Sequence, residues 1–103
     1  MLKKRFKVLT EFKTPFSLGK AEFIKFIFPH ENGRSFEKNT ATIVDSENGL
    51  VEVELSDFDI QGLKVGEKQN ILCEITTIDE KFTVLFSKAL TIEMVGDRKE
   101  WIK

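Results

Sequence analysis

The chain has 103 residues, of which 41% are hydrophobic, so it is long enough to form one domain with its own core. Its formal net charge is −1, which argues against a nucleic-acid partner because phosphate binding needs a concentrated positive surface. The longest uninterrupted apolar runs have three residues, and lysines interrupt the first stretch, so we expect neither a membrane partner nor a secretory signal. A single cysteine excludes an intrachain disulfide and fits production in the cytoplasm.

The first third of the chain contains two predicted strands. Residues 6–12 alternate apolar and polar side chains, which is typical of a half-buried strand, and Pro15 ends this segment. Residues 21–28 are apolar on both faces, so we expect a central strand that is covered, at least in part, on both sides. The segment 29–34 contains Asn32-Gly33, a hairpin signal.

The middle of the chain predicts a hairpin. Residues 40–44 are rich in β-branched side chains. Residues 50–55 alternate strictly, with Val51, Val53 and Leu55 expected inside. Asn48-Gly49 is the predicted turn that pairs the two strands.

A short helix is expected after this hairpin. Ser56 is followed three residues later by Asp59, which is the spacing of a capping box. The predicted helix extends to about Leu63. Alternation then predicts three more strands, at residues 70–78, 82–86 and 90–94.

These elements predict the fold class. About seven short strands and one short helical turn are typical of an all-β, immunoglobulin-like antiparallel β-sandwich, with a small barrel as the alternative. We expect the sandwich to occupy residues 1–96 and residues 97–103 to form a short charged tail.

Charge is unevenly distributed along the chain. Residues 1–20 contain six lysines or arginines and one acid, a net of +5, whereas residues 45–59 contain six acids and no base, a net of −6. The two segments could be ordinary solvated strand faces. They could also be complementary patches that guide association between subunits or with a partner.

Few residues are candidates for chemistry. His30 is the only histidine and lies in a predicted turn, and Cys73 falls on the apolar face of a strand. The acids near Asp45 and Asp59 are explained by turn and cap geometry better than by calcium binding. We therefore expect no enzyme, no cofactor and no metal.

The remaining candidates are interface residues. A tryptophan in a tail either folds back on the core or anchors another subunit, and tryptophan is enriched at binding hot spots. The possible interface residues are Trp101, Ile102, Asp57 and Asp59.

Residues 39–55, from Asn39 through the Asn48-Gly49 turn to Leu55, resemble a family sequence pattern that is followed by a short helix, a glycine and a strand. The family is the immunoglobulin-like N-terminal domain of the baseplate upper proteins, which occur in phages of Gram-positive bacteria. The segments 16–23 and 30–34 fit the same family, and the resemblance covers about residues 6–95. Longer family members continue into coiled-coil and receptor-facing parts, so the chain is expected to be either a small virion protein or an N-terminal fragment.

This resemblance implies a structural virion protein of the tail or baseplate, made in the bacterial host. Its expected partners are other tail or baseplate proteins, with several copies in the assembled particle. The alternative is a bacterial module that binds a cell-wall sugar or peptide. A single Trp and no Tyr argue against sugar binding, whereas an aromatic-lined groove would support it.

Overall fold

The computed structural model describes residues 1–103 as eight strands and one short helix. In chain order these elements are β1 (Leu2–Lys7), β2 (Phe23–Pro29), β3 (Ser35–Lys38), β4 (Thr42–Asp45), β5 (Leu50–Leu55), α1 (Asp57–Gln61), β6 (Gly66–Thr76), β7 (Lys81–Val95) and β8 (Arg98–Trp101).

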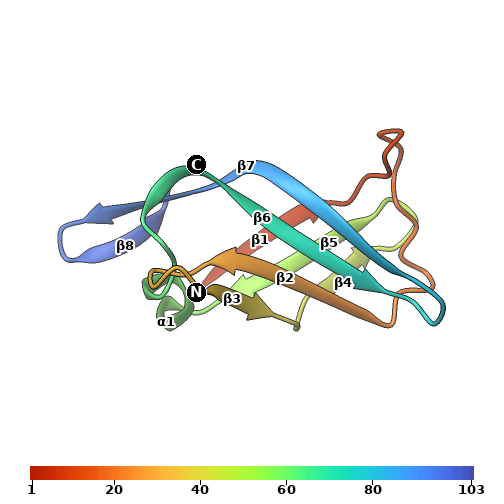
Figure 1. The fold of residues 1–103 in the computed structure, drawn as a ribbon, viewed down its shortest axis with the longest axis horizontal. Coiled ribbons are helices and arrows are strands. Elements are labelled where there is room, and N and C mark those ends of the chain that lie inside the picture. Colours follow the sequence, from red (N-terminus) through yellow and green to blue (C-terminus); the bar gives the residue numbers. More distant parts are fainter.

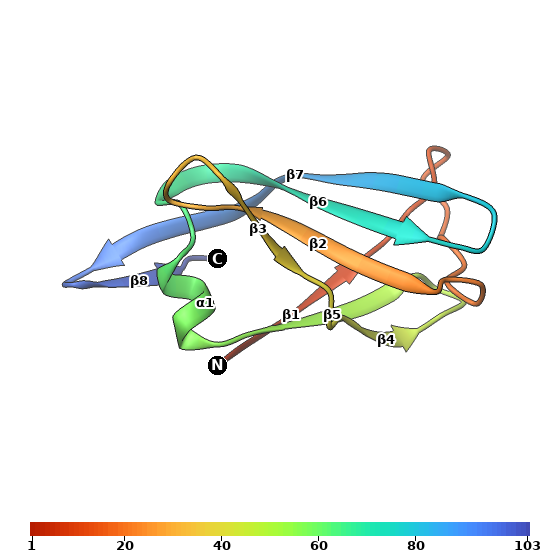
Figure 2. The ribbon, with the colours of Figure 1, turned by 60° about the horizontal axis from the view of Figure 1, so that its bottom comes forward.

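The strands form two antiparallel sheets. One sheet has five strands in the order β3-β2-β6-β7-β8, and the other has three in the order β1-β5-β4. The sheets face each other as two layers, with α1 at one end between them (Figures 1 and 2). The predicted all-β antiparallel sandwich with one short helical turn is therefore confirmed.

The core lies between the two sheets. It contains sixteen buried hydrophobic residues. Phe26 is fully buried, and its ring lies 5.0 Å from Phe6 and 6.1 Å from Phe86, measured between centroids. Phe6 comes from the three-stranded sheet and the other two rings come from the five-stranded sheet, so this cluster joins the layers.

The predicted β4–β5 hairpin is confirmed. The two strands pair antiparallel, with Ile43 opposite Val51, and a turn at residues 46–49 connects them. Val51, Val53 and Leu55 are buried, as strict alternation requires when one face of a strand covers a core. Gly49 adopts φ +68°, a conformation that suits glycine at the end of such a turn.

The predicted helix is also present. The Asp59 backbone N–H donates to Ser56 Oγ at 3.1 Å, and the Ser56 N–H donates to Asp59 Oδ2 at 2.9 Å, so the capping box is complete. The helix ends at Gln61, earlier than expected.

Three local expectations were wrong. Residues 35–38 form β3, which was not predicted, and β1 ends at Lys7, so that residues 8–16 form a loop. The two predicted strands at 82–86 and 90–94 are one strand, β7, which bends where Lys88 adopts φ +55°. The outer face of β2 is covered in part, as expected, since Phe23 is 68% exposed but Lys25 and Ile27 are partly buried.

The C-terminal segment is not a free tail. Gly96 adopts φ +66° and turns the chain back, so that β8 pairs with β7 from Val95↔Arg98 to Ile92↔Trp101. The high charge of residues 97–103 suggested a tail, but the outer side of an edge strand can hold charged side chains equally well.

Candidate functional site

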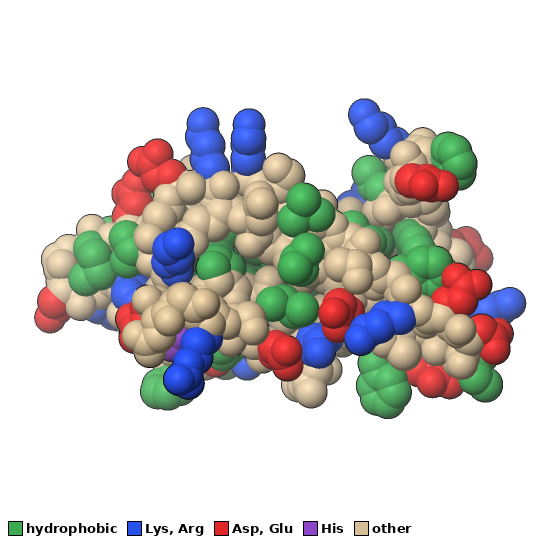
Figure 3. All heavy atoms as spheres, viewed as in Figure 1, with side chains coloured by type: hydrophobic (Ala, Val, Ile, Leu, Met, Phe, Trp, Pro, Cys, Tyr) green, Lys and Arg blue, Asp and Glu red, His purple; other side chains and the backbone are tan.

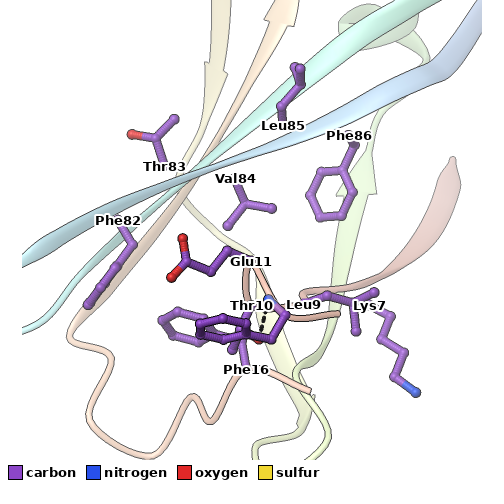
Figure 4. Close-up of a pocket in the computed structure, with 11 residues that line it drawn as sticks. Lys7, Leu9, Thr10, Glu11, Phe16, Phe82, Thr83, Val84, Leu85 and Phe86 are labelled. Atoms are coloured by element: carbon purple, nitrogen blue, oxygen red, sulfur yellow. Dashed lines mark hydrogen bonds between the residues drawn. The ribbon is translucent and has the colours of Figure 1, made fainter. Parts of the chain in front are cut away.

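A groove opens between the β1–β2 loop and the first half of β7, and it is termed here the β1–β7 groove. It has a volume of about 750 Å³ and is lined mainly by hydrophobic side chains. Figure 4 shows Phe82, Val84 and Phe86 on the side of β7 that faces Leu9 and Phe16, with Thr83 and Leu85 on the opposite side. The groove therefore lies where the two layers of the sandwich separate.

The loop that forms one wall is held by local hydrogen bonds. Leu9 and Pro15 form an isolated antiparallel bridge. Thr10 Oγ1 lies 2.7 Å from Thr14 Oγ1 and accepts from the Phe12 N–H at 3.3 Å. This hairpin-like loop protrudes from the body of the molecule (Figure 3). Its residue Phe12, which lines the groove, is 79% exposed.

The side of the groove opposite the loop is formed by β7, which contributes the aromatic residues Phe82 and Phe86. The Phe16 and Phe82 rings make an edge-to-face contact, with centroids 5.2 Å apart. The Phe86 ring lies 5.0 Å from Phe6 at the border of the core. The groove is thus a surface extension of the core, which is favourable for apolar side chains of a ligand.

A smaller hollow lies further along β1 and β7. It has a volume of about 320 Å³, and its lining includes Lys4, Lys88, Trp101 and Lys103. The pKa of Lys4 is lowered, first by burial and then by the charge of Lys103. Positive charge is therefore concentrated in this hollow without a neutralising carboxylate among the residues that line it.

The two oppositely charged segments of the sequence are neighbours in one sheet. β1 pairs with β5, which places Lys3 opposite Glu54 and Arg5 opposite Glu52. Arg5 Nε lies 2.9 Å from Glu52 Oε2. Part of the charge that was considered for subunit association is therefore neutralised within the chain.

Trp101 folds back on the sandwich. Its ring lies 6.3 Å from Phe28 in an edge-to-face contact, and Lys4 Nζ lies 5.1 Å from the ring centroid. The Ile102 N–H donates to the Thr91 carbonyl at 2.9 Å. Trp101 therefore packs against the core, at the border of the smaller hollow, which is the first of the two roles considered for it.

The two acidic candidates have different environments. Asp57 is exposed and accepts a hydrogen bond from the N-terminal ammonium at 3.1 Å. Asp59 is only 8% exposed, and its Oδ2 accepts from Lys38 Nζ at 2.7 Å. The Asp59 carboxylate is turned inward, where it caps α1, as its spacing from Ser56 predicted, and pairs with Lys38, and a role for Asp59 at an interface stays a prediction. The four predicted residues do not form one site.

The Asp59 carboxylate predicts a measurable pH dependence of stability. Partial burial raises its pKa, but the Lys38 ammonium and the Ser56 hydrogen bonds outweigh burial, so the pKa lies below the ordinary value of 3.8. A lowered pKa stabilises the fold fully above that ordinary value and loses this effect as the pH falls through the folded-state pKa. We expect Asp59→Asn to reduce the free energy of unfolding at pH 7 by about 1–3 kcal/mol.

Urea denaturation of wild type and Asp59→Asn at pH 7 and at several values below 4 measures this effect. The difference between the two proteins should shrink as the pH falls. Asp57→Asn, on the same helix but exposed, is the matched control and should change stability little. An equal loss in both variants at pH 7 would show that the Lys38 pair does not matter.

The other chemically reactive residues have structural environments. Cys73 is fully buried, and burial, followed by the charge of Glu74, raises its pKa to about 12. Its predicted core position is confirmed. His30 begins the turn of the β2–β3 hairpin, where its Nδ1 accepts from the Asn32 N–H at 3.4 Å. No group of three or more His, Cys, Asp or Glu side chains is placed to hold a metal ion. The single helix has five residues, too few to cross a membrane.

Sequence reasoning did not find the groove. The only signal was the large number of phenylalanines, ten in all. Alternation placed Phe12 in a strand, and it could not show that Phe16 and Phe82 meet from distant parts of the chain.

Comparisons with known proteins found no relative of this chain. No protein-family model, no curated protein and no solved structure matches it.

Proposed function

We propose that the protein is a non-catalytic adaptor of a phage tail or baseplate, which docks other virion proteins. The proposal starts from the resemblance of residues 39–55 to baseplate upper proteins. In the assembled particle it would be present in several copies, with other tail or baseplate proteins as partners.

The observation that best supports a docking role is the β1–β7 groove. Its lining is mainly apolar and includes Phe12, which is 79% exposed. Exposed hydrophobic surface of this kind is typical of interaction sites. The residues around it offer no nucleophile with an adjacent base, so binding fits the groove better than a reaction does.

Mass spectrometry of purified particles tests this proposal. Particles induced from the strain that encodes the chain would be purified on a density gradient, and their proteins quantified against the major tail protein. We expect the chain at a fixed ratio of several copies per particle. Its absence from particles, while the cell extract contains it, would contradict a virion role.

The aromatic lining favours a second candidate, a module that binds a cell-wall peptide or sugar. The groove offers Phe16, Phe82 and Phe86, but it has few polar side chains to orient hydroxyl groups. A peptide therefore fits better than a sugar. Titration with muropeptides and with cell-wall oligosaccharides, followed by isothermal titration calorimetry, separates the two ligands. Binding of either at micromolar concentration would favour this second function.

A further inference from the structure

The first half of β7 has a free edge. β7 pairs with β6 from Lys81 onward, whereas β8 covers its other edge only between Ile92 and Val95. β1, on the other side of the groove, also has a free edge, since β5 is its only strand partner. Two free edges thus border the β1–β7 groove, and Figure 2 shows β1 and β7 in opposite layers.

The backbone groups on this edge are available for pairing. The Thr77 N–H donates to the Glu80 carbonyl at 2.8 Å, which closes the β6–β7 turn. Antiparallel ladders alternate between residues that bond to the neighbouring strand and residues that point away from it. Counting from this turn, Thr83 and Leu85 direct their N–H and C=O groups away from β6, toward the free edge.

The side-chain pattern of β7 determines which side chains of an added strand would enter the groove. Phe82, Val84 and Phe86 face the groove, and Thr83 and Leu85 face outward. A strand added beside them would place every second side chain in the groove, because side chains alternate across a sheet. Those side chains must be apolar to match the aromatic lining.

The charged side chains that line the groove and the smaller hollow are mostly lysines without an ion-pair partner. Lys7 lines the β1–β7 groove, Lys4, Lys88 and Lys103 line the smaller hollow, and none of the four is in an ion pair. The only acid among the lining residues is Glu11. The complementary partner is therefore acidic overall: its outward-facing carboxylates are attracted to these lysines at a distance rather than through direct ion pairs.

We infer that the free edge of β7 accepts an extended acidic segment from another protein as an added strand, with its alternate apolar side chains in the β1–β7 groove. This inference rests on the proposed docking function and names the chemistry of the partner. A second copy of this chain fits less well. Pairing of β7 with β7 across a two-fold axis would bring the lysines together, and β4, the acidic edge strand, has only four residues.

Fluorescence anisotropy with a labelled peptide tests the inference on the intact protein. The probe is an acetylated peptide of four Val-Glu repeats, about 26 Å long when extended. Four Val-Lys repeats control for charge, and a Val-Glu peptide with alternate amides methylated controls for strand pairing. We expect saturable binding of the Val-Glu peptide, at least about tenfold tighter than either control.

Two sets of variants locate the site. Thr83→Pro removes one edge N–H at a position where an edge strand tolerates proline, so the fold should persist by circular dichroism while peptide binding weakens by about tenfold or more. Lys7→Glu with Lys88→Glu should also weaken binding on the order of tenfold. Lys20→Glu with Lys64→Glu makes the same change in net charge at exposed lysines outside the groove, and it should leave binding unchanged.

The outcomes separate this inference from the proposed function. No binding of the Val-Glu peptide, equal binding of the methylated peptide, or full binding by Thr83→Pro would overturn strand addition. Oligomers of the wild type without peptide that disappear in Thr83→Pro would identify a second copy as the occupant and also overturn it. Presence of the chain in purified particles is measured independently, so a virion role can hold when strand addition fails, and the reverse.

Discussion

Phe26→Ala is expected to reduce the free energy of unfolding by about 3–5 kcal/mol, because it leaves a cavity where the two sheets meet. Phe26 is fully buried, and its ring contacts the rings of Phe6, Phe28 and Phe86. A loss of this size is a large part of the stability of a small domain. Neighbouring rings could fill the cavity only by leaving their own packed positions.

Denaturation in urea, followed by circular dichroism, measures this loss. Phe23→Ala is the matched control, since it lies on the same strand with its side chain 68% exposed on the outer face, and it should cost less than about 0.5 kcal/mol. Similar losses in the two variants would mean that the core is not where the structure places it.

Gly49→Ala is expected to destabilise the protein by about 2–5 kcal/mol, through two separate effects. The residue has φ +68°, which is unfavourable for alanine. In addition, a Cβ at this position would lie 2.4 Å from the Val8 carbonyl oxygen and 2.8 Å from the Phe16 carbonyl oxygen. Both atoms belong to the backbone, so the loop that forms the groove wall must move.

Gly96→Ala separates the two effects. Gly96 has φ +66°, but a Cβ there would have no atom within 4 Å, so only the conformational cost of about 1–2 kcal/mol applies. The variants are compared by urea denaturation and by amide chemical shifts of residues 8–16. We expect a larger loss and shifted loop resonances in Gly49→Ala alone. Equal losses would show that the close backbone approach is relaxed in solution.

The Gly49 contact connects stability to the candidate site. The Gly49 carbonyl accepts from the Val8 N–H, and the Val8 carbonyl accepts from the Phe16 N–H. The β4–β5 turn thereby anchors both ends of the loop that carries Phe12. A variant that disturbs this anchor should also weaken ligand binding in the groove, although Gly49 does not line it.

The local pattern of the sequence determined much of this protein. Strict alternation placed Val51, Val53 and Leu55 inside, because side chains of a strand alternate across the sheet. Ser56 and Asp59 marked the start of the helix, since the capping box depends on residues only three positions apart. The apolar face of β6, with Cys73 at its centre, followed from the same period of two.

Tertiary structure alone decided the rest, because it depends on which distant segments meet. β3 and β8 are short edge strands with weak alternation, and pairing with β2 and β7 makes them strands. The ion pair between Lys38 and Asp59 forms only because β3 brings Lys38 to the helix. The β1–β7 groove exists because β8 covers one end of β7 and leaves the other free, and the approach of two unpaired edges far apart in the chain, those of β1 and β7, leaves no local trace in a sequence.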